Sequence, residues 1–419
     1  MKQSLSVAMI TCVFMLMAFS AADARVKGVC QGCHTMHNSQ GGQPMAKVTG
    51  SSTDTYWSGN AINSIGNTSA PNEHLLRTDC IGCHSNAGTQ TIVSYEGNSV
   101  PIVHNIQKPD YEKSGANNAL AGGNFYWTDP NSGTDYAADH GHNIFNADPV
   151  LSSPPGFGAQ DPNCGSNGVC HKSLYNIQDL SYPFPALSPC RGCHYITWHH
   201  KKKGFFSTYP NALKIDPSYR FLSGHRLIGL MGYSTDFVQG IEDPNFEQSP
   251  SSTAHNVYLA NGTSSGTSFV GAASGLTNTS NHSLSAFCAA CHGIFHEDQK
   301  DSAGVWIRHP VDVLVSSLVS DGHENESFFY NGPDGYGANT YDPAVPVAFG
   351  ITNPYTQTAA NYSAISATDG RVTCVSCHRT HASPYPQMLR FDYSAIIAGN
   401  SATAGGDGCF ACHTEKSLE

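Results

Sequence analysis

Six copies of the pentapeptide C-x-x-C-H are the residues of this chain whose types and spacing predict chemistry most directly. Two thiols at this spacing can each form a thioether on one edge of a porphyrin, and the histidine that follows can bind the iron as its proximal ligand. Composition alone predicts roughly 0.03 such pentapeptides by chance. The motifs therefore predict six covalently bound haem c groups. Their residues are Cys30, Cys33 and His34; Cys80, Cys83 and His84; Cys190, Cys193 and His194; Cys288, Cys291 and His292; Cys374, Cys377 and His378; Cys409, Cys412 and His413.

Disulfide bonds and zinc are the alternatives for paired cysteines. Setting aside Cys12, which lies in a predicted leader, reduces the 15 cysteines to 14, an even number suited to disulfides in an oxidising compartment. Disulfides, however, give no reason for a histidine directly after every pair. Zinc would need four ligands gathered at each site. Haem is therefore favoured at all six motifs.

A seventh site is predicted where the final Cys-His is kept but five residues separate the cysteines. Cys164 and Cys170 would attach the haem, and His171 would be its proximal ligand. Gly165 and Gly168 would let the longer loop bulge away and return to the porphyrin edge. A disulfide that closes this small loop is the alternative that stays open.

The sixth position of each iron needs a further ligand. Of the 21 histidines, 14 remain after the seven proximal ones, whereas only four methionines follow the leader. Bis-histidine coordination is therefore the economical assignment, and it predicts low-spin haems of low potential. His37 and His381 each lie three residues after a proximal histidine, so they suit a neighbouring haem. One of His199 and His200 is a further candidate.

The first 24 residues are predicted to be a signal peptide for export. Lys2 precedes an apolar stretch at 5–19, and Ala22-Asp23-Ala24 is a cleavage signature. No later stretch approaches the roughly 18 apolar residues that a membrane span needs. The motifs are spread from residue 30 to residue 413, so residues 25–419 are predicted to form a single multihaem domain.

Composition predicts a mostly irregular fold with short α-helices, few strands and a haem-filled core. Charged residues are only 13%, with 41 glycines and 23 prolines, so haem macrocycles would supply much of the buried apolar surface. The net charge of −11 argues against nucleic-acid binding. Helices are expected over 283–297, 309–319, 372–381 and, less regularly, 221–230; coil is expected over 110–165 and 325–365, and a loop over 249–283.

Several local matches identify a resemblance to a known family. They are CQGCHTMHNS at 30–39, GHNI at 141–144, CAACHGIFH at 288–296, RHP at 308–310, GH at 322–323 and CVSCHRTHAS at 374–383. In this order they resemble the OmcS-like outer-surface multihaem c-type cytochromes of metal-reducing bacteria, which polymerise into conductive filaments. The likeness extends along nearly the whole mature chain, and the first and last matches are the most specific.

The resemblance implies an extended body with haems stacked in alternating parallel and T-shaped pairs, all with bis-histidine ligation. It implies that His37 binds a haem of the next subunit and so makes the haem row continuous. The distal ligands carried over or chosen on this basis are His37, His104, His142, His199, His309, His323 and His381. The family pattern has six haems, so the seventh site is an addition, for which His225, His255 or His296 could supply a ligand.

The predicted function is long-range electron transfer at the outer cell surface or outside the cell, without enzymatic activity. The expected partners are copies of the chain itself, other redox proteins and extracellular acceptors such as metal oxides. Two alternatives are a monomeric periplasmic electron shuttle and a multihaem reductase of a small nitrogen or sulfur oxyanion. A reductase would need an iron with an open position, and the chain has no C-x-x-C-K variant.

Overall fold

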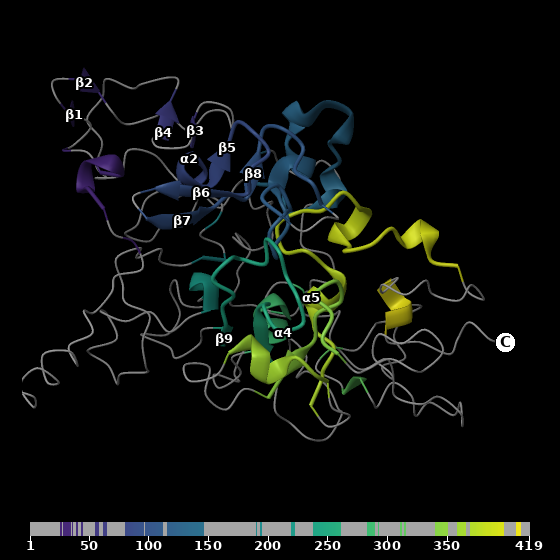
Figure 1. The fold of residues 1–419 in the computed structure, drawn as a ribbon. Helices are drawn as coiled ribbons and strands as arrows, with labels where there is room; N and C mark the ends of the chain where they lie inside the picture. The colour runs from purple at the N-terminus through teal and green to yellow at the C-terminus, as the bar shows by residue number, and fades with distance from the viewer. Residues whose placement is uncertain are drawn as a thin grey trace, which may run out of the picture.

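The computed structural model describes the chain in separate stretches (Figure 1). The longer ones are residues 80–95, 97–111, 115–145, 238–260, 340–350, 358–365 and 369–397. Shorter pieces lie at 26, 28–34, 36, 39–40, 43–44, 55–57, 62–64, 190, 193–194, 219–222, 283–289, 292, 311, 314–315 and 408–411. The predicted signal peptide, residues 1–24, lies outside them.

The described α-helices are short, and each contains a motif cysteine. They are α2 (Cys80–His84), α4 (Leu284–Ala289) and α5 (Cys374–Cys377). α4 and α5 confirm parts of the helices predicted over 283–297 and 372–381. α2 was not predicted, because a single turn leaves no helical periodicity in the sequence. No helix among the described residues has the length and apolar character needed to cross a membrane.

The strands are also short and pair into small sheets. They are β1 (Ser39–Gln40), β2 (Gln43–Pro44), β3 (Thr55–Trp57), β4 (Ile62–Ser64), β5 (Ser85–Asn86), β6 (Ile92–Tyr95), β7 (Asn98–Pro101), β8 (His104–Asn105), β9 (Gly240–Ile241), β10 (Val257–Leu259) and β11 (Ala348–Phe349). β1 pairs with β2 and β6 with β7, and the two larger sheets have the orders β4-β3-β5-β8 and β11-β10-β9. Parallel pairing of β5 and β8 places Ser85 opposite His104. The predicted fold class is confirmed.

The segment 110–165, predicted as coil, is tightly packed where it is described. It contains three 3-10 helices, at Phe125–Thr128, Pro130–Asp135 and Ala138–His140. Side chains cap the first two: Asn124 accepts the N–H of Tyr126, and Asp129 accepts that of Asn131. All four residues of the first of these helices are buried. The described part of this segment is therefore irregular but well packed.

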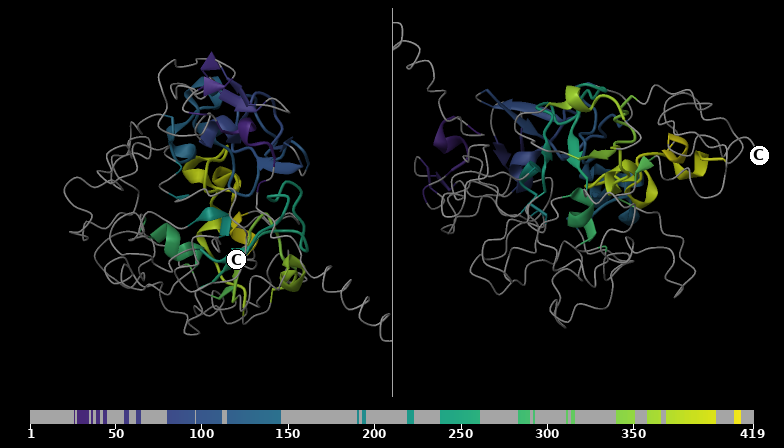
Figure 2. Two further views of the ribbon diagram at one scale, coloured as in Figure 1. Left: turned by 90° about the vertical axis from the view of Figure 1, so that its left-hand side faces the viewer. Right: turned by 90° about the horizontal axis from the view of Figure 1, so that it is seen from below.

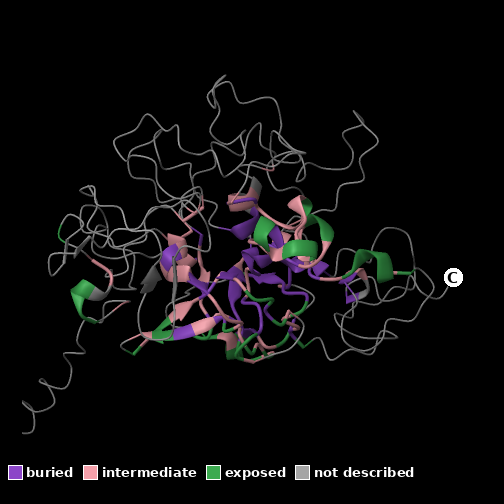
Figure 3. Cartoon of the chain, turned by 90° about the horizontal axis from the view of Figure 1, so that it is seen from above, coloured by how far each residue is buried: buried purple, intermediate pink, exposed green. Residues whose placement is uncertain are grey.

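Apolar side chains of the described residues also pack against one another in clusters, in the middle of the molecule (Figure 3). One cluster consists of Ile241, Val257, Val315, Tyr341, Val347, Phe349, Tyr362, Ile365 and Val372. Val257 and Tyr258 are buried in β10, so the prediction of a loop over 249–283 is wrong there. A three-residue strand between polar stretches is too short to give a periodic signal. Likewise Leu314, within the helix predicted over 309–319, instead forms a β-bridge with Arg371.

Segments far apart in the sequence meet beside the motif of α5. Residues 119–145 lie against residues 379–390, so the blue and yellow parts of the chain are side by side (Figure 2). The guanidinium of Arg379 donates to the carbonyl of Leu120 at 3.0 Å, and the N–H of Ser383 donates to the carbonyl of His140 at 2.9 Å. This contact brings the residues that follow the motif of α5 next to the GHNI segment.

Candidate haem centres

The described parts of the motifs form helical turns. In such a turn, residues three apart lie on one face, so the two cysteines of a motif share a side and the histidine follows directly. The histidine N–H closes the turn on the carbonyl of the first cysteine. The bonds are His34 to Cys30 (2.8 Å), His194 to Cys190 (2.8 Å), His292 to Cys288 (3.0 Å) and His378 to Cys374 (3.0 Å), and α2 spans the whole second motif. This local geometry suits attachment to one porphyrin edge.

Three motif histidines have a hydrogen bond that fixes which ring nitrogen is protonated. In each, Nδ1 lies close to a backbone carbonyl of another segment. The pairs are His84 with Pro101 (2.7 Å), His194 with Arg220 (2.9 Å) and His378 with Gln387 (2.8 Å). Because a carbonyl oxygen can only accept, Nδ1 carries the hydrogen and Nε2 keeps its lone pair. This tautomer binds a metal through Nε2 while the other nitrogen is held in place.

Two of the predicted distal ligands are half-buried and neutral. The Nδ1–H of His142 donates to the carbonyl of Thr380 at 2.8 Å, so His142 has the same tautomer. Burial lowers the pKa of His142 to about 4, assisted by the nearby His292. Burial, together with the neighbouring His194, lowers the pKa of His381 to about 3. Both imidazoles therefore keep an unprotonated nitrogen at neutral pH.

Two pairs of histidine rings have the spacing of two ligands on one iron. The ring centres of His142 and His292 are 6.2 Å apart, and those of His194 and His381 are 6.3 Å apart. Two imidazoles on opposite sides of one metal would have centres about 6.2–6.3 Å apart, from metal–nitrogen bonds of about 2 Å and about 1.1 Å between each nitrogen and its ring centre. Each pair joins a motif histidine to a predicted distal ligand. The distance between the rings would therefore suit an iron between each pair.

One backbone arrangement holds both distal rings. We call residues 122–124, 141–143 and 380–383 the junction. Within it, the N–H of His142 donates to the carbonyl of His381 at 2.9 Å, and the N–H of His381 donates to the carbonyl of Gly122 at 2.6 Å. The two rings thus start from hydrogen-bonded backbone positions but face different motif histidines. The junction therefore sets the positions of ligands at two candidate iron sites at once.

Glycine at two positions allows the segments of the junction to approach one another closely. Gly123 and Gly141 each form a β-bridge with Ala382. A Cβ atom on Gly123 would overlap the carbonyl oxygen of Ala382, and Gly123 also has φ +83°. A Cβ atom on Gly141 would overlap the Ala382 side chain. Glycine is therefore required at both positions, although the sequence match at GHNI pointed only to the histidine.

The motif of α5 lies close to the last motif. Cys374 and Cys377 are both thiols, as attachment of a haem requires. Burial raises the pKa of the Cys377 thiol to about 12, and the neighbouring Cys409 contributes to this rise. Because Cys409 begins the last motif, the two attachment sites are near one another.

His104, a further predicted distal ligand, is placed differently. Its Nε2 atom is 2.8 Å from Oδ2 of Asp129, and its ring centre is 4.8 Å from that of Phe145. Within the described residues its ring is not paired with a motif histidine, so its role as a ligand stays a prediction. Asp129 was missed from the sequence, because nothing local distinguishes it from other aspartates near glycine and proline.

His255, one of three candidates for an additional ligand, belongs to the protein core. Its ring stacks on Tyr341, with centres 3.5 Å apart, and its Nδ1–H donates to the carbonyl of Asn256 at 2.7 Å. Tyr341 is itself part of the apolar cluster that contains Ile241 and Val257, and His255 is 0% exposed. The structure therefore favours a packing role for this histidine over iron binding.

The remaining predicted site residues lie outside the described residues. They are Cys164, Cys170 and His171 of the seventh site, Cys291, Cys412 and His413 of the regular motifs, and His37, His199, His225, His296, His309 and His323 among the distal candidates. Their assignments stay predictions.

Comparisons with known proteins agree with the motifs. A family model described as a doubled CXXCH motif matches residues 367–418, which contain the last two motifs. The C-type cytochrome OmcS of Geobacter sulfurreducens is 25% identical over 440 residues, covering 96% of this chain and 88% of that protein.

Two solved structures from Geobacter sulfurreducens are also similar, each at 21% identity. One is of OmcS nanowires, with a TM-score of 0.47 over 95% of this chain and 92% of that chain. The other is an Outer Membrane Cytochrome S filament, with a TM-score of 0.41 over 94% of this chain and 89% of that chain. TM-scores this low support no functional inference. By its motifs and its sequence alignment, the chain is similar to a c-type cytochrome over nearly its whole length.

Proposed function

We propose that this protein is a multihaem c-type cytochrome that moves electrons through a row of bis-histidine haems. The observation that carries the proposal is the spacing of the pairs His142–His292 and His194–His381, at 6.2 and 6.3 Å. Haem would supply an iron that cycles between ferric and ferrous states. The chain would attach it through paired thiols and fix the imidazoles of His142 and His194 by bonds from Nδ1–H to backbone carbonyls. It would also enclose the rings in buried surroundings.

Electron transfer is favoured over catalysis at these two sites. A pair of imidazoles at this spacing would fill both axial positions of an iron, so no position would stay open for a substrate. Burial keeps the imidazoles of His142 and His381 unprotonated near neutral pH, so protonation would not compete with an iron for these two rings. Such a site can change its oxidation state with little change in its surroundings.

The intact mass of the holoprotein tests the cofactor count. We expect seven haem increments, because each of six motifs binds one haem and Cys164 with Cys170 binds another. The variant Cys164→Ser/Cys170→Ser should lose one increment, and Cys80→Ser/Cys83→Ser should lose one as a matched control. Six increments in the native protein, unchanged in the first variant, would remove the seventh site. A holoprotein without any haem would overturn the proposed function.

We further propose that copies of the exported chain assemble into a filament outside the cell and pass electrons to other redox proteins or to acceptors such as metal oxides. OmcS, which aligns with 96% of this chain, forms nanowires. Val29 and Met36, on either side of the first motif, are exposed by 54% and 71%. Exposed apolar side chains beside a motif would suit contact with another copy.

His37→Ala tests the predicted ligand between subunits. We expect loss of filaments by electron microscopy and one high-spin haem per chain, because the neighbouring subunit's iron would lose its second imidazole. Met36→Ala is the matched control: it removes apolar contact next to the ligand, so assembly should weaken, while every haem in the filaments that still form stays low-spin. Intact filaments and unchanged spectra for His37→Ala would reject the ligand. Monomers of the native protein would favour the periplasmic shuttle.

A further inference from the structure

Left-handed backbone at residues other than glycine is confined, within the described part of the chain, to three pairs of adjacent residues. The pairs are Arg220–Phe221, Phe246–Glu247 and Gln387–Met388, with φ between +46° and +61°. In this region the Cβ atom of an L-residue crowds the following carbonyl oxygen, so each pair is held against a steric cost. Such strain persists only where the surrounding structure imposes it, and it is often found at functional sites.

Each pair forms the centre of a tight turn. The N–H of the residue after the pair donates to the carbonyl of the residue before it. The distances are 2.8 Å for Leu222 and Tyr219, 3.3 Å for Leu389 and Pro386, and 2.9 Å for Gln248 and Asn245. Positive φ at both central residues defines the type I′ turn, in which glycine, asparagine or aspartate is usual. None of the six central residues is of these types, so the residues themselves do not explain the turns.

Two of the turns present the same atom to a motif histidine. The carbonyl of Arg220 accepts the Nδ1–H of His194 at 2.9 Å. The carbonyl of Gln387 accepts the Nδ1–H of His378 at 2.8 Å. In both turns this is the carbonyl between the two left-handed residues. The residue after each pair also forms an antiparallel β-bridge with the same histidine: Leu222 with His194, and Leu389 with His378.

The third turn serves a different purpose. Its middle carbonyl, that of Phe246, accepts the backbone N–H of Ala121 at 3.1 Å. It therefore joins two segments of the chain through their backbones. A left-handed pair alone does not indicate a ligand, and the hydrogen bond to an imidazole ring distinguishes the first two turns.

The handedness of a turn decides where its middle carbonyl points. A type I turn of the same four residues is the mirror image of type I′, so its middle carbonyl would point to the opposite face, away from the ring. The Nδ1–H of the histidine would then lose its acceptor, and the ring would lose the bond that fixes its tautomer and direction. His194 and His378 are both half-buried, so each keeps exposed surface that a haem can cover.

The side chain and backbone of Arg220 hold the first turn in place. Its N–H donates to Oε1 of Glu242 at 2.8 Å, and its guanidinium donates to Oδ1 of the buried Asn256 at 3.0 Å. The guanidinium also lies over the ring of Phe246, 4.4 Å from the ring centre. These contacts are made by the residue whose carbonyl faces His194.

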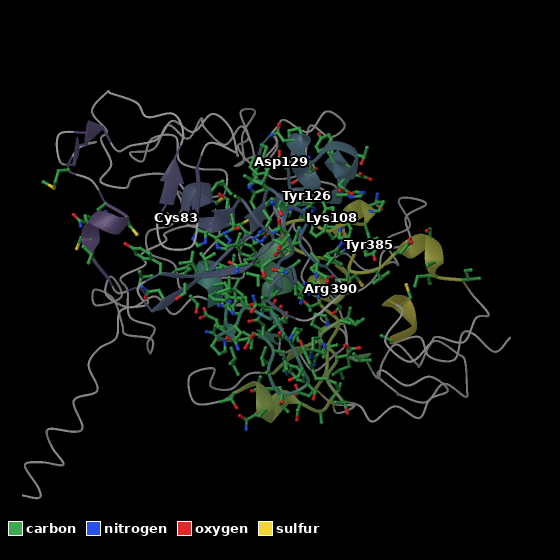
Figure 4. The ribbon with its side chains drawn as sticks, turned by 45° about the horizontal axis from the view of Figure 1, so that its top comes forward. Cys83, Lys108, Tyr126, Asp129, Tyr385 and Arg390 are labelled. Atoms are coloured by element: carbon green, nitrogen blue, oxygen red, sulfur yellow. The ribbon has the colours of Figure 1, made fainter. Side chains whose placement is uncertain are left out.

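Backbone bonds to the motif of α5 hold the second turn. The N–H of Arg379 donates to the carbonyl of Met388, and the N–H of Arg390 donates to the carbonyl of Cys377, each at 2.8 Å. Tyr385 and Arg390, which are labelled in Figure 4, are the residues directly before and after this turn. The two turns are thus fixed by different contacts but give the same result at the histidine.

We infer that the left-handed turns 219–222 and 386–389 position His194 and His378 as iron ligands, with Arg220 and Gln387 as the positioning residues that act through their backbone carbonyls. The inference rests on the proposed function, in which these histidines bind haem iron. A carbonyl that accepts from Nδ1–H makes the imidazole a stronger electron donor, which favours the ferric state. Each turn therefore lowers the reduction potential of its own haem.

Gln387→Pro in the holoprotein tests this inference by redox titration. Gln387 is exposed, so the change acts mainly through the backbone. Proline fixes φ near about −65° and excludes the left-handed turn. We expect the ferric preference of the haem on α5 to fall about tenfold, within the range for loss of a metal ligand's supporting group. That change corresponds to a rise of about 59 mV for one electron. The haem count by intact mass should not change.

Gln387→Gly is the matched control. It removes the same side chain, with its contact to Asp139 at 3.4 Å, but glycine adopts positive φ freely. Every haem potential should keep its native value. Ser252→Pro controls for the introduction of a proline, because Ser252 is a central residue of the turn closed by the N–H of Ala254 and the carbonyl of Ser251 at 3.2 Å. It should also shift no potential.

Arg220→Val makes the equivalent change in the other turn, because a β-branched residue strongly disfavours positive φ. It should raise the potential of a different haem, the one on His194. Arg220→Gly is its control: it loses the same guanidinium contacts but allows the left-handed turn, so the potential should stay at its native value. If Gln387→Pro accumulates poorly, Gln387→Val gives the same comparison with Gln387→Gly.

The outcomes separate failure of the inference from failure of the proposed function. Unchanged potentials in Gln387→Pro and Arg220→Val, with the native haem count, would overturn the inference and leave the proposed function standing. If only one of these variants shifts a potential, the role of the other turn is overturned. Equal shifts in the glycine variants would assign the effect to the lost side chains and also overturn the inference. A native protein with no haem to titrate would overturn the proposed function itself.

Discussion

His381→Ala is expected to convert one haem of the holoprotein from low-spin to high-spin without changing the number of haems. The thioethers and His194 would still hold that haem, but alanine cannot fill the second axial position. His142→Ala should do the same to a different haem, the one on His292. Electron paramagnetic resonance measures the number of high-spin irons per chain, and intact mass confirms the haem count.

His140→Ala is the matched control for both substitutions. His140 lies two residues before His142, and its backbone carbonyl accepts the N–H of Ser383 in the junction. Its removal should leave every haem low-spin. The double variant His142→Ala/His381→Ala should give two high-spin haems, because the two rings face different motif histidines. A single high-spin haem in the double variant would show that the pairing proposed here is wrong.

Gly123→Ala is expected to destabilise the fold by about 3 kcal/mol or more and to give the high-spin haem seen in His381→Ala. The φ of +83° is strained for alanine, and the new Cβ would overlap the backbone oxygen of Ala382. Because the obstacle is backbone, no side-chain rotation can relieve it. The peptide of Ala382 must shift, and it adjoins His381. Chemical denaturation and spin-state measurement together check the two parts of this expectation.

Gly97→Ala separates backbone strain from overlap. Gly97 also has a positive φ, +78°, but a Cβ atom there would meet nothing within 4 Å. This variant should lose only about 1 kcal/mol and keep all haems low-spin. Equal destabilisation in Gly97→Ala and Gly123→Ala, with no high-spin iron in either, would contradict the role given to the junction.

Haem attachment could be predicted from the sequence because five consecutive residues determine it. The turn from Cys374 to His378, for example, is closed by a bond inside the motif itself. The short helices and irregular chain also follow from composition, because frequent glycine and proline interrupt longer elements. Haem attachment and the irregular character of the chain could therefore be predicted without knowledge of the fold.

Pairing of ligands could not be predicted, because it depends on the path of the chain. The resemblance named His142 and His381, but no sequence pattern relates either ring to the motif histidine it faces. Gly123 is one of 41 glycines, and the need for it arises only from the approach of Ala382. The burial of β10 could not be predicted for the same reason. Its partners β9 and β11 are two-residue strands, too short to give a pattern, and β11 is also distant in sequence.

The junction has a consequence for how proteins of this design can diverge. The segments of the junction come from residues before 145 and after 379. Cys190 begins the motif whose histidine, His194, lies opposite His381. The interval 146–189 therefore connects the junction to the motif that begins at Cys190, and His194 of that motif lies opposite His381 of the junction. Lengthening such an interval costs only about 0.6 kcal/mol for each doubling. A segment inserted in or deleted from this interval, such as 164–171 with its proposed seventh haem site, would therefore be expected to leave the spacing of the ligand pairs unchanged.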